Sequence, residues 1–278
     1  MKVAGSSTLA VVLAATLVPG AVLAQSPPSS VFIEALTWVE IRDRMEDYAT
    51  NIIVPTAGTE QNGPHMVMGK HRYILEYTMD KVARALGNTL VSPIITYVPE
   101  GEWGEEPTGH MRMPGTITMP EEWFVELLLH TGRSHKEAGF DNVFFVGDSG
   151  GNYSGMETAV ETLNREWAGS GARAHLIEDY YRKSGQDARD YITGELGIAA
   201  EEIGGHAGIS DTSQLWFVNE QHIRQGLLAD RGGFEGSGSS GNATLASPEI
   251  GRRIVNMKIE NALAEIRAVL DGQQEDDR

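Results

Sequence analysis

The chain has 278 residues, a formal net charge of −17 and 41% hydrophobic residues, a proportion that is sufficient for a sizeable core. Its excess of acidic side chains argues against a nucleic-acid binder and against a binder of anionic membranes, because both need clustered Lys and Arg. The sequence contains no cysteine, which excludes disulfides, thiol nucleophiles, iron–sulfur clusters and zinc sites with cysteine ligands.

Residues 1–24 are predicted to be a secretory signal peptide. Lys2 supplies a positive start, Leu9–Leu17 is an almost continuous apolar run, and small residues precede a cleavage site between Ala24 and Gln25. The apolar run is short for a membrane anchor, and no later segment of the sequence is long and apolar enough to cross a bilayer. We therefore expect a secreted or periplasmic protein that has no membrane contact once the leader is removed.

Residues 25–278 alternate strand and helix signals and are predicted to form one domain. In chain order, the expected elements are a strand at Asn51–Pro55, a helix at Arg72–Leu86, a strand at Thr89–Tyr97, a helix at Pro120–Gly139, a strand at Asn142–Val146, a helix at Met156–Ala168, a strand at Ala172–Ile177 and a helix at Pro248–Leu270. The Gly- and Ser-rich residues 231–247 are expected to be a loop. Strands separated by helices of this length indicate an α/β fold, with a mostly parallel sheet and helices on both faces.

Three polar, glycine-containing segments follow predicted strands or precede predicted helices, where α/β proteins place their functional groups. Glu60, His65 and His71 lie in the first segment, and their side chains suit a metal or an acid–base cluster. The second is Gly147–Asn152 and the third begins at Gly204. A simpler alternative is that His65 and His71 only form hydrogen bonds with the loop backbone.

Taken together, these segments resemble the motifs of the creatininase (creatinine amidohydrolase) family. Five stretches match the family's pattern in order: Val54–Gly69, Met113–Met119, Val146–Asn152, Gly205–Ser213 and Gly241–Ser247. The resemblance spans nearly the whole chain after the leader. It implies a doubly wound α/β hydrolase of small cyclic amides and related C–N bonds, usually a homo-oligomer, with two metals that activate a water molecule.

This sequence departs from the family at several ligand positions. Glu60 and His206 match the family's residues, whereas Asn62, His71, Ser149, Gly151 and Asp211 replace a His, an Asp, a His, a Glu and a Glu, respectively. Neutral imidazole has one lone pair and cannot bridge two cations, so we expect one divalent metal (zinc, manganese or iron) in place of two.

The resemblance, together with the chemistry of the residues themselves, suggests roles for individual residues. The expected metal ligands are Glu60, His71, Asp148 and Asp211. The expected catalytic residues are His206, Glu60 and Ser149. The expected substrate-binding residues are His110, Trp103 and Asn62. The expected reaction is hydrolysis of an amide or lactam-like C–N bond in a small molecule. The acidic residues near Trp103, which begin at Glu100, are expected to be solvated or to attract a cationic substrate.

Two other functions remain open from the sequence. Gly147–Gly151 fits the Gly-x-Ser-x-Gly elbow of serine hydrolases, with His206 and either Asp179 or Asp190 as partners of Ser149. Alternatively, the metal site is eroded and the protein is a non-catalytic small-molecule binder or scaffold. Metal content and reactivity of the serine discriminate among the three functions.

Overall fold

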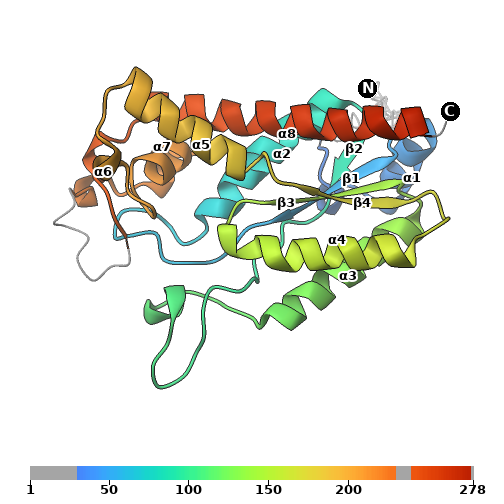
Figure 1. Cartoon of the computed structure of the whole chain (residues 1–278), viewed down its shortest axis with the longest axis horizontal. Coiled ribbons are helices and arrows are strands. Elements are labelled where there is room, and N and C mark those ends of the chain that lie inside the picture. The colour runs from blue at the N-terminus through green and yellow to red at the C-terminus, as the bar shows by residue number, and fades with distance from the viewer. Residues whose placement is uncertain (1–29, 230–238, 277–278) are drawn as a thin grey trace, which may run out of the picture.

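Four parallel strands form a sheet in the order β2-β1-β3-β4 (Figure 1). They are β1 (Asn51–Thr56), β2 (Thr89–Val91), β3 (Asn142–Gly147) and β4 (Arg173–Ile177). All residues of β1, β2 and β3 are buried, as expected for strands covered on both faces. The register pairs Ile53 of β1 with Val91 on one side and with Phe144 on the other.

Helices cover both faces of this sheet, which confirms the α/β class. The computed structural model describes residues 30–229 and 239–276, and the helices within them are α1 (Trp38–Asp47), α2 (Lys70–Leu86), α3 (Glu121–Ala138), α4 (Tyr153–Glu166), α5 (Arg182–Asp190), α6 (Ala200–Ile203), α7 (Ile209–Val218) and α8 (Pro248–Asp276), with several short 3-10 turns between them. Helices α3 and α4 lie on one face, and α2 and α8 lie on the other (Figure 1).

Alternate strand residues feed two separate cores, one on each face of the sheet. The core beneath α3 and α4 includes Ile52, Val54, Val143 and Phe145. The core beneath α2 and α8 includes Ile53, Phe144, Val146 and Ile177. Because the apolar runs of β1 and β3 supply both cores, the two central strands are packed on both faces, which fixes where the loops after them begin.

The second strand is shorter than predicted. The sequence suggests a strand over Thr89–Tyr97, but β2 ends at Val91, and further along only Ile95 makes an isolated bridge, to Thr56. Pro93 lies between them and has no N–H to donate to a neighbouring strand, which explains the break.

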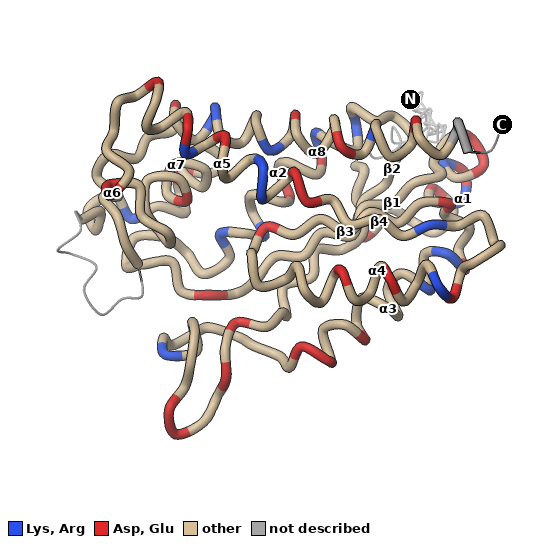
Figure 2. Tube along the Cα trace, viewed as in Figure 1, with Lys and Arg blue, Asp and Glu red and all other residues tan. Residues whose placement is uncertain are grey.

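Residues 101–108, here called the projecting segment, extend away from the body of the protein (Figure 1). Glu102, Glu105 and Glu106 are exposed on it. Figure 2 shows that this stretch is acidic, whereas acidic and basic residues occur together along much of the rest of the trace. Within the described ranges, we find no helix with the length and apolar character needed to span a membrane. The predicted leader and residues 231–238 of the predicted loop lie outside the described residues.

Candidate active site

The candidate site lies where β1 and β3 end, at the carboxyl edge of the sheet. Glu60 is on the loop after β1, His71 is in the first turn of α2, and Asp148 comes directly after β3. Their side chains line a cavity of about 630 Å³, together with His110 and His206 from segments that carry no strand. The loops that follow parallel strands lie at one edge of the sheet, so the sheet topology itself brings Glu60 and Asp148 together.

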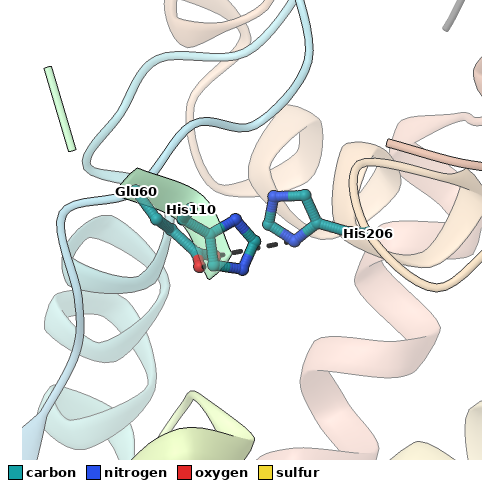
Figure 3. Close-up of side chains that lie close together, drawn as sticks. All are labelled: Glu60, His110 and His206. Atoms are coloured by element: carbon teal, nitrogen blue, oxygen red, sulfur yellow. Dashed lines mark ion pairs between the residues drawn. The ribbon is translucent and has the colours of Figure 1, made fainter. Parts of the chain in front are cut away.

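Three side chains converge at this cavity: Glu60, His110 and His206 (Figure 3). His110 Nε2 is 3.1 Å from Glu60 Oε2, and His206 Nδ1 is 3.6 Å from Glu60 Oε1. One donor atom from each residue lies within 4.8 Å of the other two. Two imidazole nitrogens and a carboxylate oxygen are a ligand set that catalytic zinc sites use, with a fourth position left for water or substrate. This donor set therefore fits one divalent metal ion.

The backbone orients His206 for this role. Its Nε2–H donates to the carbonyl oxygen of Gln61, which leaves the Nδ1 lone pair directed toward Glu60. The next residue, Ala207, has φ = 55°, a left-handed conformation that is unfavourable for a residue with a Cβ. Asp211 stabilises this turn, because its Oδ2 accepts a hydrogen bond from the Ala207 N–H at 3.0 Å.

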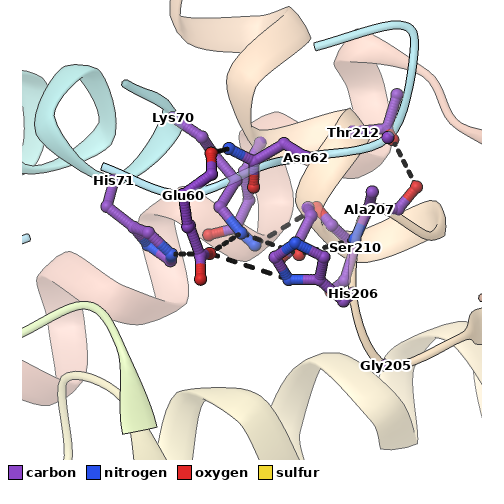
Figure 4. A network of polar contacts seen from close by, with 12 residues as sticks. Glu60, Asn62, Lys70, His71, Gly205, His206, Ala207, Ser210 and Thr212 are labelled. Atoms are coloured by element: carbon purple, nitrogen blue, oxygen red, sulfur yellow. Dashed lines mark hydrogen bonds and ion pairs between the residues drawn. The ribbon is translucent and has the colours of Figure 1, made fainter. Parts of the chain in front are cut away.

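Behind these donors lies a network of buried ion pairs (Figure 4). His71 Nε2 is 2.8 Å from Glu60 Oε1, and its Nδ1 is 2.8 Å from Asp148 Oδ2. Lys70 Nζ is 2.9 Å from Asp211 Oδ2 and 3.5 Å from Glu60 Oε1. Lys258, from α8, donates to the other oxygen of Asp148. Each of the three cavity carboxylates thus has a protein cation beside it.

This network sets the charges of its members. Burial raises the pKa of Glu60, but Lys70 and the hydrogen-bonded His71 outweigh burial and hold that pKa well below its usual range. Burial and Lys70 lower the pKa of His71, but its hydrogen bonds to Asp148 and Glu60 prevail and raise the pKa to about 9. Lys258 and His71 overcome burial and lower the pKa of Asp148. At neutral pH the inner wall therefore carries ionised groups of both signs.

Glu100 lies beside this network and is 6% exposed, so the prediction that it is solvated is wrong. Burial first, and then the negative charge of Glu60, raise the pKa of Glu100 to about 8. Glycine at position 58 leaves room for the Glu100 carboxyl group, because a Cβ there would lie 2.1 Å from Glu100 Oε1. A protonated carboxyl group therefore packs against the loop that carries Glu60.

The structure brings most of the sequence-predicted site residues to one cavity. Glu60, His71, His110, Asp148, Ser149, His206 and Asp211 all line it. Two do not: Trp103 is 63% exposed on the projecting segment, and Asn62 is fully buried, with its amide donating to the backbone carbonyl of Glu60 at 2.9 Å. His65 is also buried and contacts the Thr212 hydroxyl at 2.8 Å, which ties the loop after β1 to α7.

Sequence reasoning missed Lys70 and Lys258. Lys258 had a detectable signal, since Ile254, Lys258, Ala262 and Ile266 are spaced by four residues on α8 and the other three are buried and apolar. A lysine in such a stripe must find a buried partner or leave the core. The sequence does not indicate that this partner is Asp148, 110 residues earlier.

Comparison with known proteins matches the chain to one family. The family model "Creatininase: Creatinine amidohydrolase" matches residues 34–266. A mycofactocin precursor peptide peptidase of Mycobacterium ulcerans is 26% identical over 78% of this chain and 84% of its own length. A 3-dehydro-scyllo-inosose hydrolase of Thermotoga maritima is 28% identical, but the match spans only 41% of this chain and 34% of that relative.

Solved structures of creatininase share the fold. A creatininase structure superimposes with a TM-score of 0.70 at 19% identity and covers 86% of this chain and 97% of that one. A manganese form gives a TM-score of 0.69 at 20% identity, covering 86% of this chain and 98% of that one. A zinc form of a variant gives 0.71 at 20% identity, covering 87% and 98%.

Proposed function

Since the chain belongs to the creatininase (creatinine amidohydrolase) family, we propose that it hydrolyses an amide or cyclic-amide C–N bond with one divalent metal ion held by Glu60, His110 and His206. The convergence of these three donors on one cavity carries the proposal. Zinc, manganese and iron are the candidate ions, and the substrate is a small molecule. A divalent ion at this position would lower the pKa of a water molecule and polarise the amide carbonyl.

The residues around the donors prepare them for this task. Lys70 keeps Glu60 ionised, so that its carboxylate is available as a ligand. Burial is the main reason that the pKa of His206 lies below its usual value, so the ring is neutral at pH 7 and its Nδ1 lone pair is free. Ligation and proton transfer would compete for this atom. We assign it ligation because Glu60 and His110 converge on it.

The ligand set differs in part from the one expected from the sequence. Glu60 belongs to both sets. His71, Asp148 and Asp211 are instead engaged by one another or by lysines, and a metal would have to displace Lys70 or Lys258 to reach the two aspartates. His71 and Lys70 thereby act as positioning residues, which hold the Oε1 side of Glu60 while Oε2 faces His110.

The serine-hydrolase alternative has less support. Ser149 lines the cavity, but the described residues include no hydrogen bond between its hydroxyl group and a histidine. His206 already directs its Nε2 to the Gln61 carbonyl and its Nδ1 to Glu60. In the proposed enzyme, Ser149 is a polar residue of the cavity wall that contacts the substrate.

Export through the predicted leader and assembly as a homo-oligomer stay predictions. A fractionation assay tests the first, and light scattering tests the second.

Metal analysis of the chain from Gln25 onward tests the proposal. We expect close to one zinc, manganese or iron ion per chain, lost in His110→Asn and in His206→Asn variants whose circular dichroism is unchanged. His130→Asn is the matched control, because His130 is 74% exposed on α3, outside the cavity. Absence of metal from a wild-type sample supplied with these ions, or full metal content in both site variants, would contradict the proposal and favour a non-catalytic binder.

A further inference from the structure

The wall of the cavity carries a surplus of positive charge, although the whole chain has a net charge of −17. Its carboxylates are Glu60, Asp148 and Asp211, and the ion-pair network already gives each of them a cation. Lys70 and Lys258 supply these cations, and the surplus does not depend on the charge of His71, because four Lys and Arg side chains line the cavity against three carboxylates. Two further cations, Arg182 and Arg189, line the same cavity and are not needed for these pairs.

Both arginines project from one face of α5. Arg182, Gln186 and Arg189 are separated by four and three residues, which places them along one side of the helix. This side forms part of the cavity wall, while Glu60, His110 and His206 line another part. The donor cluster and the α5 arginines therefore border the same cavity, as a ligand that contacts both would require.

The two guanidinium groups are available for a ligand. No ion pair engages the Arg189 side chain within the described part of the chain, and this residue is exposed. Arg182 pairs with Glu178 at 3.1 Å and lies 5.0 Å from the centre of the Tyr153 ring. Its side chain remains 62% exposed, and exposed ion pairs of this kind contribute little, so a ligand can compete for it.

We propose that this face of α5 is a subsite for the carboxylate of an anionic amide substrate, such as an N-acyl amino acid or a short peptide with a free carboxyl terminus. This inference rests on the proposed function, since it places the scissile amide at the donor cluster and the carboxylate at Arg182 and Arg189. A planar guanidinium group can bind a carboxylate through two parallel hydrogen bonds, which lysine cannot.

The same charges disfavour a cationic substrate. The acidic residues that could attract one, Glu102, Glu105 and Glu106, are exposed on the projecting segment and do not line the cavity. A cation that entered the cavity would meet carboxylates already paired with Lys70, Lys258 and His71. The cavity volume of about 630 Å³ is in the range of small-molecule sites, which fits an acylated amino acid or a dipeptide.

The experiment compares two probes of similar shape, N-acetylglycine with a terminal carboxylate and N-acetylglycinamide with a neutral carboxamide in its place, by calorimetric titration of the protein as purified and after chelator treatment. We expect N-acetylglycine to bind about tenfold more tightly, which corresponds to about 1.4 kcal/mol. Arg182→Gln and Arg189→Gln should each remove most of this preference. Lys183→Gln is the control on the same helix, because Lys183 pairs with Asp187 and does not line the cavity.

The chelator-treated sample separates this inference from the metal proposal. A charge preference that persists without metal and disappears in the arginine variants upholds the subsite, even if metal analysis fails. Equal affinity for the two probes, or an unchanged preference in both arginine variants, overturns it. Tighter binding of inorganic phosphate than of N-acetylglycine would also overturn the assignment to a carboxylate.

Discussion

Replacing Lys258 with methionine tests whether the buried network needs its own cations. Methionine keeps much of the length of the lysine side chain but removes the charge. Lys258 is 6% exposed and Asp148 is 1% exposed, so the change leaves a buried carboxylate with His71 as its main cationic neighbour. Breaking a buried pair by removing one partner typically costs about 3–5 kcal/mol.

We expect Lys258→Met to lie toward the middle of this range, because the hydrogen bond from His71 remains in place. A loss of about 4 kcal/mol in the free energy of unfolding corresponds to a decrease in Tm of roughly 8–16 °C for a domain of this size. Urea unfolding followed by circular dichroism measures the loss. The double variant Asp148→Asn/Lys258→Met removes both charges and should recover most of the stability.

The pH dependence supplies a second test of the same reasoning. In the wild type the pKa of Asp148 is lowered, so its contribution to stability is present above the pKa of the unfolded state and is lost as pH falls through the folded-state pKa. Without Lys258 that pKa rises, and protonation of Asp148 at mildly acidic pH removes a buried charge that has lost its lysine partner. The deficit of Lys258→Met should therefore be smaller at pH 5 than at pH 8. A deficit below about 1 kcal/mol at pH 8, or a double variant as unstable as the single one, would refute the reasoning.

Two further predictions concern stability away from the donor cluster. Burial lowers the pKa of both His135 and His175 to about 4, so each resists protonation in the folded state. The free energy of unfolding should therefore fall as pH drops from about 6.5 to about 4, by at most about 3 kcal/mol for each residue. In urea titrations at several pH values, His135→Gln should weaken this dependence. Gly251→Ala should lower Tm measurably, because a Cβ at this position would lie 1.8 Å from the carbonyl oxygen of Ser213 where α8 crosses α7; an unchanged Tm would show that the helices separate without cost.

Local sequence patterns predict the centre of the fold well. The apolar runs of β1 and β3 need no tertiary information to be identified as buried strands, and the start of α8 follows from Ser247 and from Pro248 in the first turn. Helix α5 is different, because Arg182–Asp190 is almost entirely polar and has no apolar periodicity to detect. Packing of Ala188 and its neighbours against α6, α7 and α8 supports that helix instead.

The candidate site could be predicted only in part. A parallel sheet requires the loops after β1 and β3 to meet, so the proximity of Glu60 and Asp148 follows from the topology. The approach of His110 and His206 to Glu60 depends on segments without strands, whose course local patterns do not determine. The pairing of Lys258 with Asp148 needs the register of α8 against the sheet, which only the three-dimensional structure supplies.

That register makes α8 sensitive to a change of length. Gly251, Lys258 and Glu265 are spaced by seven residues, close to two helical turns, so they lie along one stripe. Gly251 approaches the backbone of α7, Lys258 neutralises Asp148, and Glu265 accepts hydrogen bonds from the backbone N–H groups of residues 178 and 179 after β4. A substitution at one of these positions removes one contact. An insertion or deletion of one residue between two of them rotates one part of the stripe by about 100° relative to the other, and it therefore breaks several of these contacts at once. Natural variation in this helix should therefore consist of exchanges of residues, while insertions and deletions fall beyond this stripe.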